Sequence, residues 1–232
     1  MSTAGTWLIT GATRGIGLAV TAAHLARGGS AIATHRAAPG AALDALAERH
    51  GGRLRLLAWD LRQPLSATAA EAVCDGPLEV LFGNAAIYGP RGLSFPGGPD
   101  YDGLKDAFDV NALGVIRMVE AFVPHMEGAA NPRIVAVTSL MGTAAKAGPK
   151  GLGYRISKAA LNMAMQVIAA ELQGRHIATA CLRPGHVRTD MGGPNGAIAP
   201  EESAAALLAV TDALSYRPAP QFLDLTGEPL AW

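Results

Sequence analysis

The sequence predicts a doubly wound α/β fold, in which helices cover both faces of a parallel β-sheet. Short apolar runs rich in Val, Ile and Leu alternate along the chain with longer Ala-rich stretches that have helical spacing. Several of these runs are apolar at consecutive positions, which is typical of strands buried on both faces. Because 232 residues, half of them hydrophobic, suffice for one sizeable core, we expect residues 1–232 to form a single domain.

Each element follows from this alternation. The predicted strands of a seven-stranded parallel sheet are Thr6–Thr10, Ser30–Thr34, Leu54–Trp59, Leu78–Phe82, Ile134–Thr138, Ile177–Leu182 and Gln221–Leu225. The predicted helices between them include Ile16–Arg27, Ala41–Arg49, Tyr154–Leu172 and Glu201–Leu214. Two Gly/Pro-rich segments, Gly89–Pro99 and Gly192–Pro200, interrupt the pattern. Because strands continue on both sides of them, we interpret these segments as mobile loops over a site.

The composition argues against several classes of protein. The 19 Lys and Arg balance the 19 Asp and Glu, so no net charge holds the chain on nucleic acid or on an anionic membrane. No apolar run could span a bilayer, and Met1 leads into a strand without the apolar stretch of a signal peptide. Neither the histidines nor Cys74 and Cys181 have the spacing of metal ligands. We therefore expect a soluble, cytoplasmic protein that holds no metal and uses its cysteines as core residues.

A glycine-rich segment follows the first predicted strand and opens the first predicted helix. It reads Gly11-Ala12-Thr13-Arg14-Gly15-Ile16-Gly17. Glycines here allow a tight turn and a close approach to a pyrophosphate, whose charge is stabilised by the unpaired N–H groups of the helix start. A structural turn is the alternative, but the position between strand and helix favours dinucleotide binding.

The end of the second predicted strand indicates which dinucleotide binds. An acidic residue there normally holds the ribose 2′-hydroxyl of NAD, but this chain has Thr34-His35-Arg36. Arg36, with Arg14, could hold a 2′-phosphate, which favours NADPH over NADH; the alternative is that both are solvated surface groups. Asp60, after the third predicted strand, could accept a hydrogen bond from the adenine amino group or could cap a helix.

The segment Tyr154-Arg155-Ile156-Ser157-Lys158 puts a phenol and an ammonium on one face of a predicted helix. Bringing the pKa of a tyrosine from about 10 to near neutrality takes about 4 kcal/mol of preferential support for the phenolate. One positive charge about 4 Å away, at an effective dielectric of about 20, supplies roughly that amount before desolvation. Lys158 could thus make Tyr154 a general acid or base; the alternative is a surface pair. Ser139, which follows a predicted strand, could hydrogen-bond the substrate oxygen.

These motifs occur in an order that is typical of one family. The matching residues are Thr10-Gly11 through Gly17, Asn84-Ala85-Ala86, Asn111, Ser139, Tyr154 with Lys158, and Pro184-Gly185 with Thr189. Over nearly its whole length the chain resembles the short-chain dehydrogenases/reductases of the one-domain kind, which implies a Rossmann fold. Residues 184–193 and 225–232 resemble the branch of the family that contains C-factor and the carbonyl reductase sniffer.

The resemblance implies roles for individual residues. Asn111 would hold a water that links Lys158 to solvent; the alternative is a polar helix residue that satisfies backbone groups. Thr189 and the backbone of Val187 would hold the nicotinamide carboxamide, and Asn84 would line the adenosine side. The rest of the implied cofactor site comprises Ile16, Leu61, Ala85, Pro184 and Gly185. The family usually has glycine at the position of Ala86, so a methyl group intrudes there.

The substrate pocket is predicted to be lined by Met141, His186 and Met191, and Ile87 and Tyr88 could shape it as well. The alternative for the methionines, Ile87 and Tyr88 is an ordinary place in the core or at the rim. His186 is interpreted as pocket lining rather than a catalytic base, because Tyr154 already fills that role.

Together these features predict an NADPH-dependent oxidoreductase that moves a hydride to or from the carbonyl carbon of a small aldehyde or ketone, expected to be apolar. Two alternatives remain open. Sugar-nucleotide epimerisation uses similar parts but usually requires a second domain, for which the stretch after Thr189 is short. A dinucleotide-binding signalling protein of the C-factor type is the other, although such sensors often lack the Tyr/Lys pair. Family members include monomers, dimers and tetramers, so a homo-oligomer is also left open.

Overall fold

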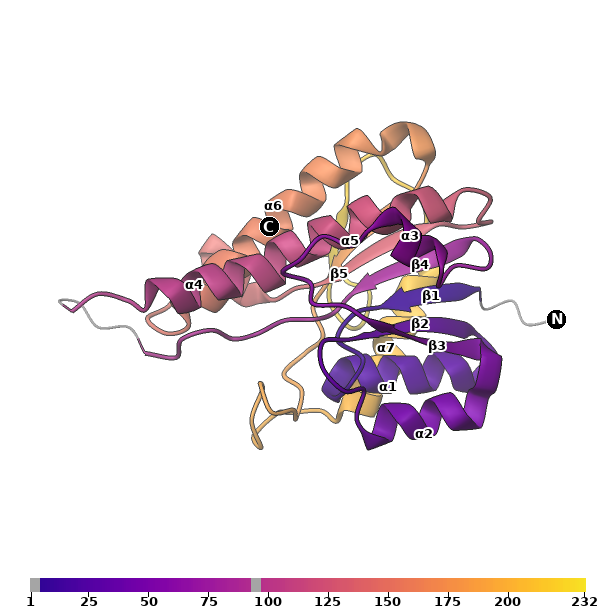
Figure 1. Cartoon of the computed structure of the whole chain (residues 1–232). Coiled ribbons are helices and arrows are strands. Elements are labelled where there is room, and N and C mark those ends of the chain that lie inside the picture. The colour runs from indigo at the N-terminus through magenta and orange to yellow at the C-terminus, as the bar shows by residue number, and fades with distance from the viewer. Residues whose placement is uncertain (1–4, 93–96) are drawn as a thin grey trace.

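A sheet of seven strands forms the centre of the computed structural model, which describes residues 5–92 and 97–232 (Figure 1). The strands are β1 (Thr6–Ile9), β2 (Ser30–His35), β3 (Leu54–Ala58), β4 (Leu78–Gly83), β5 (Arg133–Val137), β6 (Ala178–Leu182) and β7 (Gln221–Leu223). Their order is β3-β2-β1-β4-β5-β6-β7, and every neighbouring pair is parallel. The predicted seven-stranded parallel sheet is confirmed, with small differences at the strand ends. Residues 1–4, and positions 93–96 of the predicted loop Gly89–Pro99, lie outside the described residues.

Helices cover both faces of the sheet, as the sequence predicted. One face carries α1 (Gly15–Ala26), α2 (Ala41–His50) and α7 (Pro200–Ala213), and the other carries α3 (Ala67–Glu71), α5 (Gly114–Phe122) and α6 (Leu152–Glu171), with α4 (Tyr101–Phe108) packed against α6 (Figure 1). Short 3₁₀ turns span Gly51–Arg53, Val123–Met126, Leu140–Gly142, Ala144–Lys146 and Gln173–Arg175. Within the described ranges, no helix is long and apolar enough to cross a membrane.

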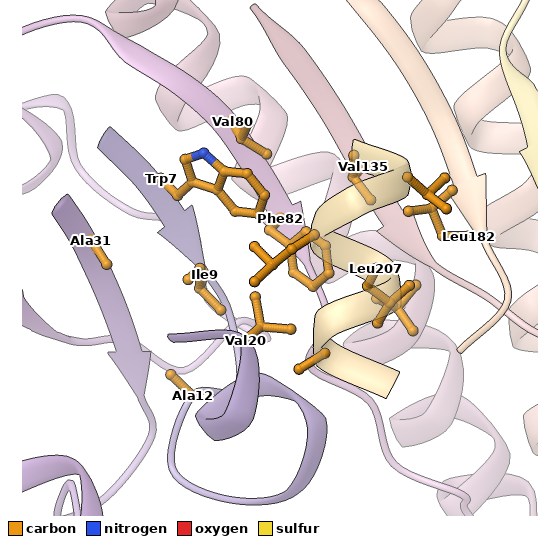
Figure 2. Close-up of a cluster of buried hydrophobic side chains, with 14 of the residues drawn as sticks. Trp7, Ile9, Ala12, Val20, Ala31, Val80, Phe82, Val135, Leu182 and Leu207 are labelled. Carbon is orange, nitrogen blue, oxygen red and sulfur yellow. The ribbon is translucent and has the colours of Figure 1, made fainter. Parts of the chain in front are cut away.

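Side-chain alternation along β1 explains why the sheet has a core on each face. Trp7 and Ile9 point toward α1 and α7, where they pack in one cluster with Val20 and Phe82 (Figure 2). Leu8, between them, belongs to the cluster under α5 and α6. Because successive side chains of a strand point to opposite faces, a strand covered on both sides must be apolar at consecutive positions.

A π-helical turn, Asp109–Leu113, joins α4 to α5. Such turns are rare and occur often at functional sites. The apolar pattern did not delimit α4 and α5, because α4 buries only Ala107 and the wide turn then shifts the helical register. The turn carries Asn111, whose side chain is fully buried.

The parallel strands bring four chemically important segments to one edge of the sheet. The registers pair Ile9 of β1 with Phe82 of β4, β4 with β5, and β5 with β6. The residues that directly follow these four strands, or stand close behind them, are Gly11, Asn84, Ser139 and Pro184. Ligands of open α/β sheets bind outside the carboxyl ends of the strands, so this edge is the expected place for a site.

At the opposite edge, His24 of α1 is completely buried in a neutral form. Its Nε2 lies 3.0 Å from the carbonyl oxygens of Gly5 and Ser30, and its Nδ1 accepts a hydrogen bond from Arg27 Nε at 3.2 Å. This bonding requires one proton, on Nε2, and a free lone pair on Nδ1. Burial, assisted by the Arg27 charge, lowers the pKa of His24 to about 4.

We expect His24 to make the protein acid-labile. Above pH 6.5 the ring is neutral in both states, so it adds no pH dependence. Between pH 6.5 and 4 the unfolded chain binds a proton that the folded protein does not, and the free energy of unfolding falls by up to about 3 kcal/mol. Urea unfolding at several pH values measures this fall. The variant His24→Gln should lack this contribution to the pH dependence of the free energy of unfolding. A His24 ring that titrates near pH 6.5 in NMR spectra would contradict the prediction.

Candidate active site

A cavity of about 1060 Å³ lies along the carboxyl edge of the sheet. It is large enough for a dinucleotide together with a small substrate, since ligand pockets typically measure about 300–1,000 Å³. With two exceptions, Gly17 and Asn111, every residue that the sequence predicted for the site lines this cavity. The linear motifs therefore converge in space.

The glycine turn forms the floor at one end of the cavity. Gly11 has a φ of +67°, and a Cβ on Gly17 would lie 2.3 Å from the carbonyl oxygen of Gly11, so neither position accepts a side chain without strain. Two neighbours hold the turn: Thr34 Oγ1 accepts the Gly11 N–H at 3.3 Å, and Asn84 Nδ2 donates to the Thr10 carbonyl at 3.0 Å. Gly17 thus acts from behind the cavity, by allowing α1 to pack closely on the turn.

The start of α1 suits a negatively charged group. The residue before the helix, Arg14, makes no side-chain cap, so the first N–H groups of α1 have no such partner. A diphosphate is the kind of ligand that bonds such groups and is stabilised by the helix dipole. The tight turn and the uncapped helix start therefore fit the diphosphate of a dinucleotide.

The end of the cavity predicted for adenosine contains an exposed cation, Arg36, and a carboxylate that is paired with an arginine, Asp60. Arg36 lines the cavity and is exposed, and it forms no ion pair with the carboxylates of the described residues. Asp60 is bonded to Arg62, whose Nη2 lies 2.6 Å from Oδ2, and this hydrogen bond lowers the pKa of Asp60. The alternative that Asp60 caps a helix is wrong: a turn follows it, and α3 is capped by Ser66.

Arg14 faces a partner that the sequence did not predict. Its Nη1 lies 2.8 Å from Asp190 Oδ2, and both side chains are 76% exposed. The pair links the glycine turn to the loop after β6, and Thr189 of the same loop would lie 3.2 Å from a Cβ on Gly15. An exposed pair of this kind contributes at most about 1 kcal/mol, so a phosphate could displace Asp190 at small cost.

Tyr154 and Lys158 lie one turn apart on α6, and both line the cavity. Lys158 is almost fully buried; its Nζ donates to the Val137 carbonyl oxygen at 2.8 Å and lies 5.7 Å from the centroid of the Tyr154 ring. Burial lowers the pKa of Lys158 to about 8. The ammonium is therefore still the main form at neutral pH, close to the phenol but bonded to the backbone.

The pKa of Tyr154 differs from the sequence-based expectation. Burial raises it to about 12, although a hydrogen bond with Ser139 acts in the opposite direction. We expected Lys158 to bring the phenol toward neutrality, but the cost of desolvating a phenolate is the larger effect here. Tyr154 thus keeps its proton at neutral pH, which is the form that a proton donor needs.

Asn111 lies behind the cavity rather than in it. Its Nδ2 donates to the carbonyl oxygen of Ile87 and to Ser157 Oγ, and its Oδ1 accepts the Ile87 N–H at 2.8 Å. The alternative role, satisfying backbone groups, is therefore what the side chain performs here. It fixes the segment after β4 against Ser157 of α6, which is three residues after Tyr154. Its part in a proton relay stays a prediction.

The end of the cavity predicted for the substrate contains Met141, His186 and Met191. Tyr88, which the sequence also offered as a pocket residue, lies there together with Arg91, which sequence reasoning missed. The ring of Tyr88 stacks on that of Tyr154, with centroids 5.1 Å apart and planes 9° apart. The guanidinium carbon of Arg91 lies 4.6 Å from the Tyr88 centroid. The one signal in the sequence was that Arg91 belongs to a Gly/Pro-rich loop interpreted as lying over a site.

Comparisons with known proteins agree with this geometry. A family model for short chain dehydrogenase matches residues 6–197. C-signal from Myxococcus xanthus is 37% identical over 164 residues, which cover 70% of this chain and 98% of C-signal. The structure of a short-chain dehydrogenase/reductase from Burkholderia multivorans with bound NADP superimposes with a TM-score of 0.89 and 33% identity over 98% of this chain and 99% of that one. Carbonyl reductase Sniffer of D. melanogaster gives 0.85 and 26% over 98% and 99%.

Proposed function

Because the chain belongs to the short-chain dehydrogenase family, we propose that it is an NADPH-dependent oxidoreductase that reduces an aldehyde or ketone, or oxidises the matching alcohol, by hydride transfer. The observation that carries the proposal is that Tyr154 and Lys158 line the same cavity as the glycine turn. A small carbonyl compound as partner and a cytoplasmic location belong to the same proposal.

NADPH, when bound, supplies the hydride. The glycine turn and the start of α1 would hold its diphosphate, and Val187 and Thr189 its carboxamide. Arg36 would hold the 2′-phosphate, because it is the exposed cation at the end of β2 where NAD-binding proteins place a carboxylate. Arg14 would join it only after exchanging Asp190 for the phosphate. The Burkholderia relative that contains NADP supports this choice of cofactor.

We expect Arg36→Ala to weaken NADPH binding by about 10-fold or more and to leave NADH binding nearly unchanged. A hydrogen bond between charged groups contributes about 1.5–3 kcal/mol, and NADH lacks the 2′-phosphate. Fluorescence titration of the two reduced cofactors gives both dissociation constants. Arg49→Ala, at the far end of α2, is the matched control. An equal loss for NADPH and NADH would show that Arg36 does not read the 2′-phosphate.

The chain's own residues would handle the proton. Tyr154, protonated at neutral pH, donates to the substrate oxygen as charge develops there, and Ser139 supplies a second hydrogen bond to the same atom. The phenolate left behind is stabilised by the Lys158 ammonium, whose Nζ lies 5.7 Å from the centroid of the Tyr154 ring. In the oxidative direction the same groups take the proton from an alcohol.

The experiment that tests this function is a panel of aldehydes and ketones, followed by the loss of NADPH absorbance with NADH in parallel. We expect NADPH-dependent reduction of at least one class of carbonyl compound. No turnover with any compound, despite tight NADPH binding, would contradict the proposal. That outcome would favour the signalling alternative, which is otherwise less favoured because a pure binding protein needs no phenol buried beside an ammonium.

A further inference from the structure

Arg91 is a cation at the substrate end of the cavity that has no carboxylate partner among the residues that the structure describes. It lines the cavity together with Tyr88, Tyr154 and Met191, and its Nη2 lies 3.5 Å from the Met191 carbonyl oxygen. None of the ion pairs among the described residues includes it, and residues 1–4 and 93–96 contain no Asp or Glu.

Two ring contacts, Arg91 on Tyr88 and Tyr88 on Tyr154, keep this guanidinium near the reacting centre. It lies over the ring of Tyr88, which itself stacks on Tyr154, so its carbon is within about 10 Å of the Tyr154 centroid. Tyr88 is in turn confined by Gly151, where a Cβ would lie 2.6 Å from the Tyr88 hydroxyl. A cation that stacks on a fixed ring loses less conformational freedom on binding an anion than a mobile side chain does.

The charges around the cavity also favour an anion. Only two acidic residues are found among its described lining residues, Asp60 and Asp190, and each is paired with an arginine. As long as Arg14 stays paired with Asp190, an anionic substrate group meets no unpaired carboxylate there, while Arg91 and the Lys158 ammonium attract it. Arg36 lies beside the end of β2, so Arg91 and Lys158 are the charged groups available to an anion beside Tyr154.

We propose that Arg91 binds a carboxylate of the substrate, so that the preferred substrates are aldehydes or ketones that carry a carboxylate about one benzene ring away from the reacting carbonyl. This inference rests on the proposed function and narrows its substrate class from apolar carbonyl compounds to amphiphilic ones. The apolar body of the substrate lies against Met141 and Met191, and the carboxylate lies at the mouth beside Arg91. The guanidinium offers the two parallel N–H donors that a carboxylate accepts.

The test compares 4-carboxybenzaldehyde with its methyl ester, which keeps the ring and the aldehyde but carries no charge. We expect kcat/KM for the acid to exceed that for the ester by about 10-fold or more in the parent protein. Arg91→Gln should remove this preference by lowering only the value for the acid, and Arg91→Lys should restore part of it as a point charge. Arg217→Gln, which removes one exposed positive charge away from the cavity, should leave the preference unchanged.

A binding measurement separates failure of this inference from failure of the proposed function. The dissociation constant of 4-methylbenzoate for the NADP-loaded protein should rise about 10-fold in Arg91→Gln, whether or not either aldehyde is reduced. Equal binding of 4-methylbenzoate to parent and variant, or equal losses for the acid and the ester, would overturn the role of Arg91. If neither aldehyde is turned over but binding of the anion depends on Arg91, the carboxylate site stands, and the full panel of aldehydes and ketones decides the reductase function.

Discussion

Replacing Tyr154 with Phe should lower kcat by roughly 10²–10⁴-fold, which is the usual contribution of a positioned general acid. The variant keeps the ring that stacks on Tyr88 at 5.1 Å, so the packing around α6 should persist. It loses only the hydroxyl, whose proton is held at neutral pH because burial raises the pKa to about 12. We therefore expect the dissociation constant for NADPH and the melting temperature to stay close to those of the parent.

The measurements are steady-state kinetics with a carbonyl substrate and a fluorescence titration with NADPH. Tyr101→Phe is the matched control, because this tyrosine is exposed on α4 and does not line the cavity. Turnover by Tyr154→Phe within a few-fold of the parent would mean that another group donates the proton. A variant that has lost NADPH binding as well would point to a structural role for the hydroxyl.

The sheet was predictable because each strand carries its own signal. β1 is covered on both faces, so Trp7, Leu8 and Ile9 are all apolar, and the same rule delimited the other strands. The π turn at Asp109–Leu113 has no comparable signal, because it arises from how α4 and the turn itself pack against α6 rather than from a period in the sequence. The resemblance to the short-chain dehydrogenases is confirmed by the family model that matches residues 6–197. It could be predicted because its motifs follow the ends of strands that carry their own signal.

Long-range partners and burial limited what could be predicted of the site. Arg14 and Asp190 are 176 positions apart, and nothing in either segment indicates the other. The position of Arg91 near the site depends on its stacking on Tyr88 and on the stacking of Tyr88 on Tyr154, which belongs to a different segment of the chain. Charge spacing correctly put Lys158 beside the phenol, but the pKa of Tyr154 depends on how much water its pocket excludes. That quantity is a property of the packed structure, not of the motif.

Lys158→Met is expected to slow turnover by about 100-fold and, at the same time, to make the protein more stable. A unit charge about 6 Å from the centre of the Tyr154 ring, over which a phenolate spreads its charge, contributes about 3 kcal/mol at an effective dielectric of about 20 to the step that leaves Tyr154 charged. The same charge is unfavourable in the folded protein, because burial lowers its pKa from 10.5 to about 8. Active-site groups often reduce stability in this way.

The sign of the stability change follows from the two pKa values. Below pH 8 the lysine is charged in both states, and burying that charge reduces the free energy of unfolding by about 3 kcal/mol. Between pH 8 and 10.5 the folded protein releases the proton first, so the penalty disappears as the pH rises. Methionine carries no charge but leaves the Val137 carbonyl without its donor, at a cost of about 1 kcal/mol. The net gain should be about 2 kcal/mol at pH 7, and toward pH 10.5 it should fall through zero to a loss of up to about 1 kcal/mol.

Urea unfolding of the cofactor-free protein at pH 7, 8.5 and 10 measures this gain, and kinetics over the same range measure the other half of the prediction. The parent should lose its rate advantage over Lys158→Met as the pH rises through 8, because the neutral amine no longer stabilises the phenolate. Lys105→Met removes an exposed lysine that pairs with Asp102 on α4, and it should change neither quantity appreciably. A Lys158→Met variant that is less stable than the parent at pH 7 would mean that the ammonium's bond to Val137 outweighs its desolvation, and the low pKa of Lys158 would then be wrong.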